Sequence, residues 1–151
     1  MAQVGYRTII DNLKTAISGG TGLNTNLSRV VMQVVDGDPF IVPIPNTMYP
    51  TIMVDLMGME EEWSDLGNSR KNITLTLNIY CLIFYQGTSA DSDKEAHHLA
   101  DNVEQIIRAD VTLSGTVDWM SPASTDFATG FKDGVHLSCA VIELKIFKLI
   151  S

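Results

Sequence analysis

The chain is short of basic residues and of cysteine, and it contains no long apolar run. Ten Lys and Arg residues stand against 18 Asp and Glu residues, so the formal net charge is −8 at pH 7. Affinity for nucleic acid depends mainly on basic side chains that neutralise phosphates, so this balance argues against a general DNA-binding or RNA-binding surface. No stretch approaches the about 20 apolar residues of a membrane span. We expect neither a membrane segment nor a secretion signal.

The chain has only two cysteines, Cys81 and Cys139, and both lie inside apolar runs of β type. Such cysteines are best interpreted as small buried hydrophobic residues. A chain of 151 residues fits one domain, here 1–151, and can bury enough surface to fold without a disulfide or a metal.

Signatures of catalysis and of metal binding are also missing. The adjacent pair His97-His98 points in directions about 100° apart around a helix, whereas a zinc helix places two histidines four residues apart. His136 opens a predicted strand without a recognisable partner. The glycine-rich loop at 18–28 lacks the lysine of a phosphate-binding loop, and no Gly-x-Ser-x-Gly motif is present. We therefore predict no catalytic, cofactor-binding or metal-binding residues, and no enzyme activity. Paired carboxylates that only the fold brings together remain open.

The first half of the chain predicts one helix and several strands. Apolar residues at helical spacing indicate a short helix over 4–17, with Gly19-Gly20 ending it through a left-handed glycine. A β-branched run predicts a strand over 29–35, and residues 40–42 are expected to pair back on it as a hairpin. A further strand is predicted over 51–57.

The second half predicts two very long strands, at 71–86 and 135–150, around an amphipathic helix at 92–108. In that helix Ser92 and Glu95 match a capping box, and one apolar stripe predicts packing on a sheet. The apolar phase of the last strand shifts by one residue midway, which indicates a bulge or a change of packing partner. The expected fold class is α+β, with a mixed or antiparallel sheet, a packed amphipathic helix and a short N-terminal helix.

Strands of this length exceed the usual 5–6 residues. Surplus strand is most simply used against copies of the same chain, so the pattern favours a structural assembly protein. Three consecutive carboxylates are expected in solvent or facing cations, on an exposed loop or at a contact with another subunit. The end of the 71–86 strand is apolar on both faces. The candidate contacts are Glu60, Glu61, Glu62, Trp63, Tyr80, Phe84 and Tyr85.

The order of these parts resembles the tail terminator proteins of long-tailed bacteriophages, of the lambda type. The resemblance is carried by the short N-terminal helix, the segment Tyr49-Pro50-Thr51-Ile52, the long strand, the second helix, and residues 110–117. In relatives an acidic residue is followed by a Thr-Leu-small-Gly-x-Val turn into a strand, and here that turn is Asp-Val-Thr-Leu-Ser-Gly-Thr-Val.

The resemblance implies a homo-oligomeric ring, typically a hexamer, in the tail or neck of a virion assembled in the host cytoplasm. Its implied partners are further copies of the chain, the tail tube protein, the head–tail connector or neck protein, and in some tails the sheath protein. DNA would pass through the ring without specific binding. Two alternatives stay open, namely another ring protein of the phage neck or tail, and a cytosolic α+β protein that binds a small ligand or a metal.

Overall fold

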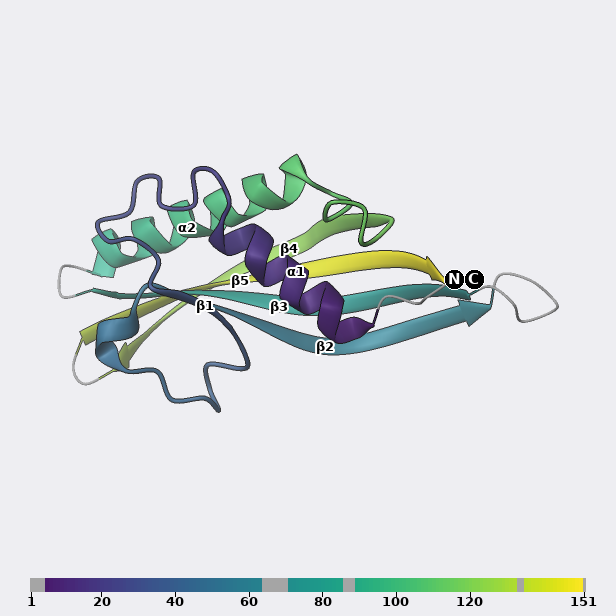
Figure 1. The fold of residues 1–151 in the computed structure, drawn as a ribbon. Coiled ribbons are helices and arrows are strands. Elements are labelled where there is room, and N and C mark those ends of the chain that lie inside the picture. Colours follow the sequence, from purple (N-terminus) through teal and green to yellow (C-terminus); the bar gives the residue numbers. More distant parts are fainter. Residues whose placement is uncertain (1–4, 64–70, 86–88, 133–134, 151) are drawn as a thin grey trace.

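We describe the protein from a computed structural model, in which residues 5–63, 71–85, 89–132 and 135–150 are described. These residues form one five-stranded mixed sheet with two α-helices, the α+β fold that the sequence predicts (Figure 1). The elements in chain order are α1 (Tyr6–Ser18), β1 (Gln33–Asp36), the short 3-10 helix η1 (Asn46–Met48), β2 (Thr51–Trp63), β3 (Lys71–Tyr85), α2 (Ser89–Ala109), β4 (Trp119–Lys132) and β5 (Val135–Ile150). The strand order is β1-β2-β3-β5-β4, and only β1 and β2 run parallel.

The two longest strands, β3 and β5, lie inside the sheet. Residues 71–85 pair with residues 136–150 without a break, while β2 and β4 pair along their other sides. The expectation that these two strands need another copy is therefore wrong for their backbones, because they are paired along both sides within one chain. Among the described strands, the open edges lie on β4, on the short strand β1, and on β2 beyond Val54.

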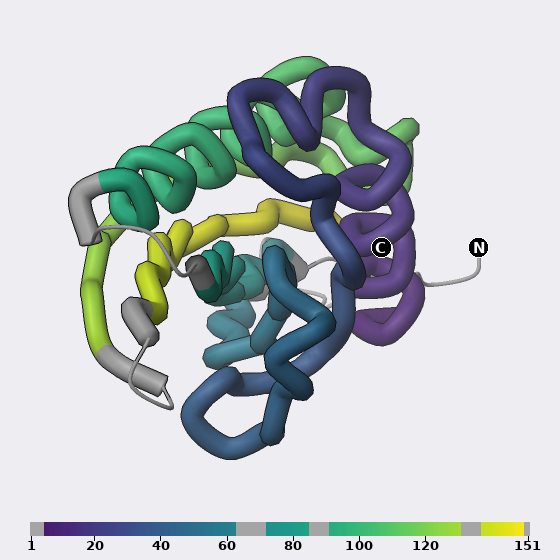
Figure 2. Tube along the Cα trace, turned by 90° about the vertical axis from the view of Figure 1, so that its left-hand side faces the viewer, coloured from purple at the N-terminus to yellow at the C-terminus, as the bar shows by residue number. Residues whose placement is uncertain are grey.

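Both helices cover one face of the sheet, which we call the helix face (Figures 1 and 2). Their apolar stripes meet alternate residues of the strands, among them Ile52, Leu77 and Ile142, all fully buried. Leu13 of α1 and Leu99 of α2 are buried in the same cluster. Full burial of a side chain of this size is worth about 1.5–3 kcal/mol, so this layer holds the fold together.

The opposite face is covered over one end only. The segment 37–50 folds beneath the sheet and builds a second cluster around Tyr49, Met53 and Tyr80. The prediction that 80–85 is covered on both faces is confirmed for residues 80–83, whereas Phe84 is half-buried and the side chain of Tyr85 lies outside the described residues. In β5 the pairing continues without a bulge. Its apparent change of phase is a change of packing partner, because Cys139 and Val141 pack in the second cluster.

The ends of the two helices differ from the sequence predictions. Helix α1 ends as expected, but Gly19 has φ −95°, so no left-handed glycine stops it. A Cβ on Gly20 would overlap the Ile106 side chain, so this glycine allows α1 and α2 to approach closely. Helix α2 begins at Ser89, which places Ser92 and Glu95 inside it, so the predicted capping box is wrong. Arg108 lies in the last turn of α2, as expected.

The first strands also differ from the predictions. β1 is limited to Gln33–Asp36 and runs parallel to β2, and residues 40–42 form a turn instead of a hairpin strand. β2 continues to Trp63, beyond the predicted end at residue 57. The residue pattern did not predict β4, Trp119–Lys132, and only the resemblance implied a strand after the turn at 110–117.

Candidate assembly surfaces

Strand β4 forms one edge of the sheet along its full length. It pairs with β5 alone, and within the described residues no other strand lies beside it. Native edge strands are usually short or carry Pro, a bulge or charges that prevent pairing with other chains. β4 has 14 residues, and Pro122 with its adjacent bulge protects only the beginning. From Ser124 to Gly130 the strand is largely exposed, and Phe127 is 53% exposed. This stretch presents backbone for pairing.

Part of β2 forms the other open edge. β1 pairs only with Thr51–Val54, so in the described part of the chain no strand covers the outer side of Asp55–Trp63. A bulge at Met57 interrupts this strand, and Met57 and Met59 are 54% and 39% exposed. Large apolar side chains beside unpaired backbone are features of a contact surface.

The three consecutive glutamates lie on this edge. The alternative that they lie on an exposed loop is therefore wrong. Glu60, Glu61 and Glu62 belong to β2, opposite Thr74, Ile73 and Asn72 of β3, and all three are exposed as expected. Strand alternation sends Glu60 and Glu62 to the opposite face and Glu61 to the helix face. The result is a strongly negative strand end. The side chains of Trp63 and Tyr85 lie outside the described part of the structure.

An apolar loop projects from the segment below the sheet. Phe40 and Ile41 are 87% and 80% exposed, and Val42 is 39% exposed. Asp38 organises this turn, because its side chain accepts the Phe40 N–H at 2.9 Å and its carbonyl accepts the N–H groups of Ile41 and Val42. The loop is thus pre-formed with its apolar side chains outward, an arrangement that lowers the entropy cost of docking.

Two of the aromatic residues predicted as contacts, Tyr80 and Phe84, belong to the second cluster. Tyr80 is buried, with its ring in edge contact with Phe40, and Phe84 is half-buried with its ring centre 5.4 Å from that of Tyr49. Tyr80 therefore supports the loop from inside the chain. The exposed apolar residues that the sequence analysis missed are those of the loop itself, which it assigned to a strand.

The surroundings of the loop are acidic. Burial raises the pKa of Asp55 above its usual value, and the negative charge of Asp38 raises it further. Asp55 lies on β2 at the start of the open edge, so carboxylates lie both at the apolar loop and on this edge.

A network of ion pairs fixes α1 to β1. Arg7 and Lys14 both contact Asp36, at 2.8 Å and 3.0 Å, and Arg7 also contacts Asp11. The hydrogen bond from Arg7 holds the pKa of Asp11 below its usual value. Burial opposes ionisation of Asp36, but hydrogen bonds from Arg7 and Lys14 outweigh it and lower the pKa of Asp36. Arg7, Asp11 and Asp36 are partly exposed to solvent, so we assign the network to orientation of the helix.

The turn after α2 holds an unusual backbone. Leu113, Ser114 and Gly115 have φ values of 52°, 55° and 85°, the left-handed region that costs non-glycine residues about 1–2 kcal/mol each. The Asp110 carboxylate holds the turn by accepting the Ser114 N–H at 2.9 Å and its hydroxyl at 3.1 Å. Leu113 is buried in the core and serves as the anchor.

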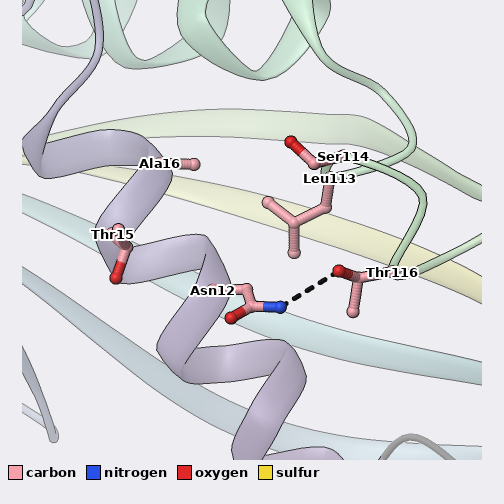
Figure 3. A pocket seen from close by; sticks show the side chains of 6 residues that line it. All are labelled: Asn12, Thr15, Ala16, Leu113, Ser114 and Thr116. Atoms are coloured by element: carbon pink, nitrogen blue, oxygen red, sulfur yellow. Dashed lines mark hydrogen bonds between the residues drawn. The ribbon is translucent and has the colours of Figure 1, made fainter.

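This turn faces α1 across a small pocket (Figure 3). Asn12 donates a hydrogen bond to the Thr116 hydroxyl at 3.0 Å, and the pocket has a volume of about 290 Å³. Its lining mixes short polar side chains with Ala16 and Leu113. Among the residues that the structure describes, no titratable side chain lines this pocket.

Two buried hydroxyls form a polar cluster that the sequence did not reveal. The Ser92 and Ser138 hydroxyls lie 2.8 Å apart, and Ser138 and Thr129 both donate to Asp93, each at 2.7 Å. These bonds connect α2 to β4 and β5. Ser92 and Ser138 are almost fully buried, so their hydrogen bonds satisfy groups that would otherwise destabilise the core.

The histidines and cysteines of the described part are placed in ordinary surroundings. His97 is exposed and its ring contacts Phe127 at 4.5 Å, and His98 is also exposed; the side chain of His136 lies outside the described residues. Burial raises the pKa of Cys139 to about 11 and that of Cys81 further. Among the described residues, no three His, Cys, Asp or Glu side chains gather as a metal site would require. No helix there is long and apolar enough to cross a membrane.

The chain was also compared with known proteins. No protein-family model matches it, and the comparison with curated proteins gave no match either.

Proposed function

We propose that this chain is a structural protein of the bacteriophage virion, a tail terminator that closes into a ring on the tail tube and stops its growth. One observation carries the proposal, namely the outer side of β4 from Ser124 onward, beside which no other strand lies within the described residues. A soluble chain that leaves such an edge unprotected is suited to pairing with another strand. Copies of the same chain provide that strand in a homo-oligomer.

The mechanism is geometric and needs no catalytic group. A ring of copies binds the last ring of tube subunits through one face, and its other face offers nothing that a further tube subunit can use. The head connector then joins at that second face. A net charge of −8 per copy keeps DNA from adhering to the passage, because like charges repel.

The apolar loop at Phe40–Val42 is the element we assign to docking on the tube or the connector. It is pre-formed by Asp38, and its two largest side chains are largely exposed. Burial of such side chains in a pocket of the partner gives most of the affinity in typical interfaces. The acidic groups near the loop, Asp38 and Asp55, favour a partner pocket with basic residues at its rim.

The turn at 110–117 supports the resemblance to the terminator family. In the motif a small residue and a glycine follow the leucine, and these positions here have positive φ. Glycine has no Cβ and adopts that backbone without steric cost, whereas Leu113 and Ser114 bear the cost. The glycine of the motif therefore has a physical reason at this turn.

The test is an assembly reaction with the tail tube protein of the same phage. The tube protein is allowed to polymerise with and without this chain, and tube lengths are measured by electron microscopy. A terminator is expected to stop growth at far less than one copy per tube subunit and to appear as a ring at one tube end. Tubes of unchanged length would overturn the proposal and favour another ring protein of the neck.

A further inference from the structure

The face of the sheet opposite the helices carries a pair of stacked aromatic rings at its uncovered end. Trp119 of β4 and Phe147 of β5 are cross-strand neighbours, with ring centres 5.4 Å apart and ring planes inclined by 23°. Phe147 follows Ile146, which is buried under the helices, so strand alternation sends Phe147 and its neighbour Trp119 to the opposite face. Neither ring belongs to the second cluster, and Trp119 is 49% exposed. Its indole ring is therefore accessible to a ligand.

Short polar side chains surround the two rings on the same face. Each of them is a cross-strand neighbour of a residue in the stretch 145–149 of β5. They are Asn72, Thr74 and Thr76 of β3 and Ser121 of β4, and each is exposed or half-buried. Leu149, which is 44% exposed, extends the apolar surface beside the rings. Because hydroxyl and amide groups both donate and accept hydrogen bonds, the rings are framed by groups of both kinds.

The charges on this part of the face offset each other near the rings. Lys145 donates a hydrogen bond to the Thr76 hydroxyl at 2.9 Å, and its ammonium lies 3.7 Å from the Glu143 carboxylate. Glu60 and Glu62 of β2 lie at the border of the same face. Among the described side chains beside the rings, Lys145 is the only cation. The surface therefore offers no excess of positive charge to an anionic ligand.

We propose that Trp119, Phe147 and the polar side chains around them, here called the aromatic platform, bind a neutral saccharide. The aliphatic face of a sugar ring packs on an aromatic ring, which is a large and rigid apolar surface. The hydroxyl groups of the sugar exchange hydrogen bonds with hydroxyl, amide and ammonium groups. Because the platform is open, it suits a stretch within an oligosaccharide chain better than a single enclosed sugar.

Other classes of ligand fit these side chains less well. Nucleic acid affinity depends on several basic contacts to phosphates, and the platform supplies Lys145 alone. The cores of protein interfaces are depleted in Lys and Ser, and Thr is rare among hot-spot residues, whereas Lys145, Ser121 and Thr76 adjoin the rings. An acidic saccharide is repelled by Glu60 and Glu62 and by the net charge of −8. A neutral saccharide meets none of these obstacles.

Surface plasmon resonance with immobilised oligosaccharides tests the proposal. The neutral probes are hexamers of glucose, of mannose, of galactose and of N-acetylglucosamine, and an oligogalacturonate serves as the acidic probe. The unaltered chain should bind at least one neutral probe and should not bind the oligogalacturonate. Binding of a saccharide needs no ring of copies, so this result does not depend on whether the chain stops tube growth.

Variants locate the binding on the platform. Trp119→Ala should weaken the binding at least about tenfold, as loss of a central aromatic contact does, and Trp119→Phe, which keeps a ring, should weaken it less. The matched control is Phe127→Ala, because Phe127 is 53% exposed on the same strand but lies on the helix face beside His97. It should bind as the unaltered chain does. Circular dichroism checks that each variant folds, and Asn72→Ala, which leaves both rings in place, should also weaken the binding if Trp119→Ala does not fold.

Three results would overturn the proposal. The first is that none of the neutral hexamers binds, and the second is that the oligogalacturonate binds as tightly as they do. The third is that Phe127→Ala weakens binding as much as Trp119→Ala. If no saccharide binds and Trp119→Ala converts an oligomer into monomers in sedimentation, the platform is a contact between subunits instead.

Discussion

Replacement of the apolar loop by polar residues is expected to separate folding from docking. In the double variant Phe40→Ser with Ile41→Ser, both altered side chains are largely exposed in the free chain, 87% and 80%. Their removal should change the free energy of unfolding by no more than about 0.5 kcal/mol, as for other surface substitutions. The Asp38 hydrogen bonds to the loop are made by backbone N–H groups and are retained.

The effect on docking should be far larger. Burial of a Phe or Ile side chain by a partner is worth about 1.5–3 kcal/mol each, so loss of both costs about 3–6 kcal/mol. Because each 1.4 kcal/mol changes an affinity about tenfold, the concentration that halts half of the tubes should rise by about 100-fold to 10,000-fold. Tube lengths measured by electron microscopy over a dilution series give this concentration.

A matched control is Val30→Ser, which removes another exposed apolar side chain, 61% exposed, from a different segment. It should stop tube growth as well as the unaltered chain does. Thermal unfolding followed by circular dichroism provides the second readout. The reasoning is refuted if the double variant stops growth at the normal concentration, or if Val30→Ser weakens capping equally.

Three further outcomes follow from the described contacts. Asp110→Ala removes the hydrogen bonds that hold the Ser114 turn, so the free energy of unfolding should fall by about 1–2 kcal/mol. Hydrogen exchange of the backbone amides at 111–117 should accelerate, and unchanged exchange would count against the role of the carboxylate. Burial and the charge of Asp38 raise the pKa of Asp55 in the folded state. Protonated Asp55 therefore stabilises the fold below its unfolded-state pKa, and this contribution is lost as the pH rises through its folded-state pKa. Asp55→Asn should therefore raise the melting temperature at pH 7 but not at pH 3, and the same gain at both would refute this. Burial raises the pKa of Cys81, so its thiol should react with a disulfide reagent at pH 8 only after unfolding, whereas rapid reaction of the folded chain would contradict its burial.

Strong periodicity made the central parts of the fold predictable. The spacing of Leu99 and Val103 in α2 and of Leu75 and Leu77 in β3 can be satisfied by one element type only, and both elements form as expected. In β5 the change of phase correctly indicated two packing partners. The two faces of β5 could be distinguished because its register with β3 is fixed and successive side chains point to opposite faces.

The edges of the sheet were much less predictable, for physical reasons. β4 contains Pro122 and small polar residues, and Phe127 at its centre faces largely toward solvent, so it lacks the alternation that marks a half-buried strand. The end of β2 combines three carboxylates, which reads as a loop, yet pairing with β3 imposes a strand. Edge residues contact solvent or a partner, so the fold of one chain constrains their identity only weakly.

Local motifs failed where tertiary contacts competed for the same side chains. Ser92 and Glu95 match a capping box, but the Ser92 hydroxyl meets Ser138, and the Glu95 carboxylate accepts the Ser28 N–H at 2.5 Å. Both side chains thus bind residues far away in the sequence. Such pairings depend on the placement of α2 over β5, which no local pattern encodes.

The division of the sheet into a closed face and open edges suggests how assembly is controlled. The helix face is filled by α1 and α2, so pairing along β4 requires no rearrangement of the main core. What opposes it is charge, since each copy carries −8 and the β2 edge ends in Glu60, Glu61 and Glu62. Such repulsion is felt over about 8 Å at physiological salt, so copies approach each other reluctantly in free solution. A tube end with basic residues at its rim would offset the repulsion, and this would favour ring closure on the tube over closure before docking.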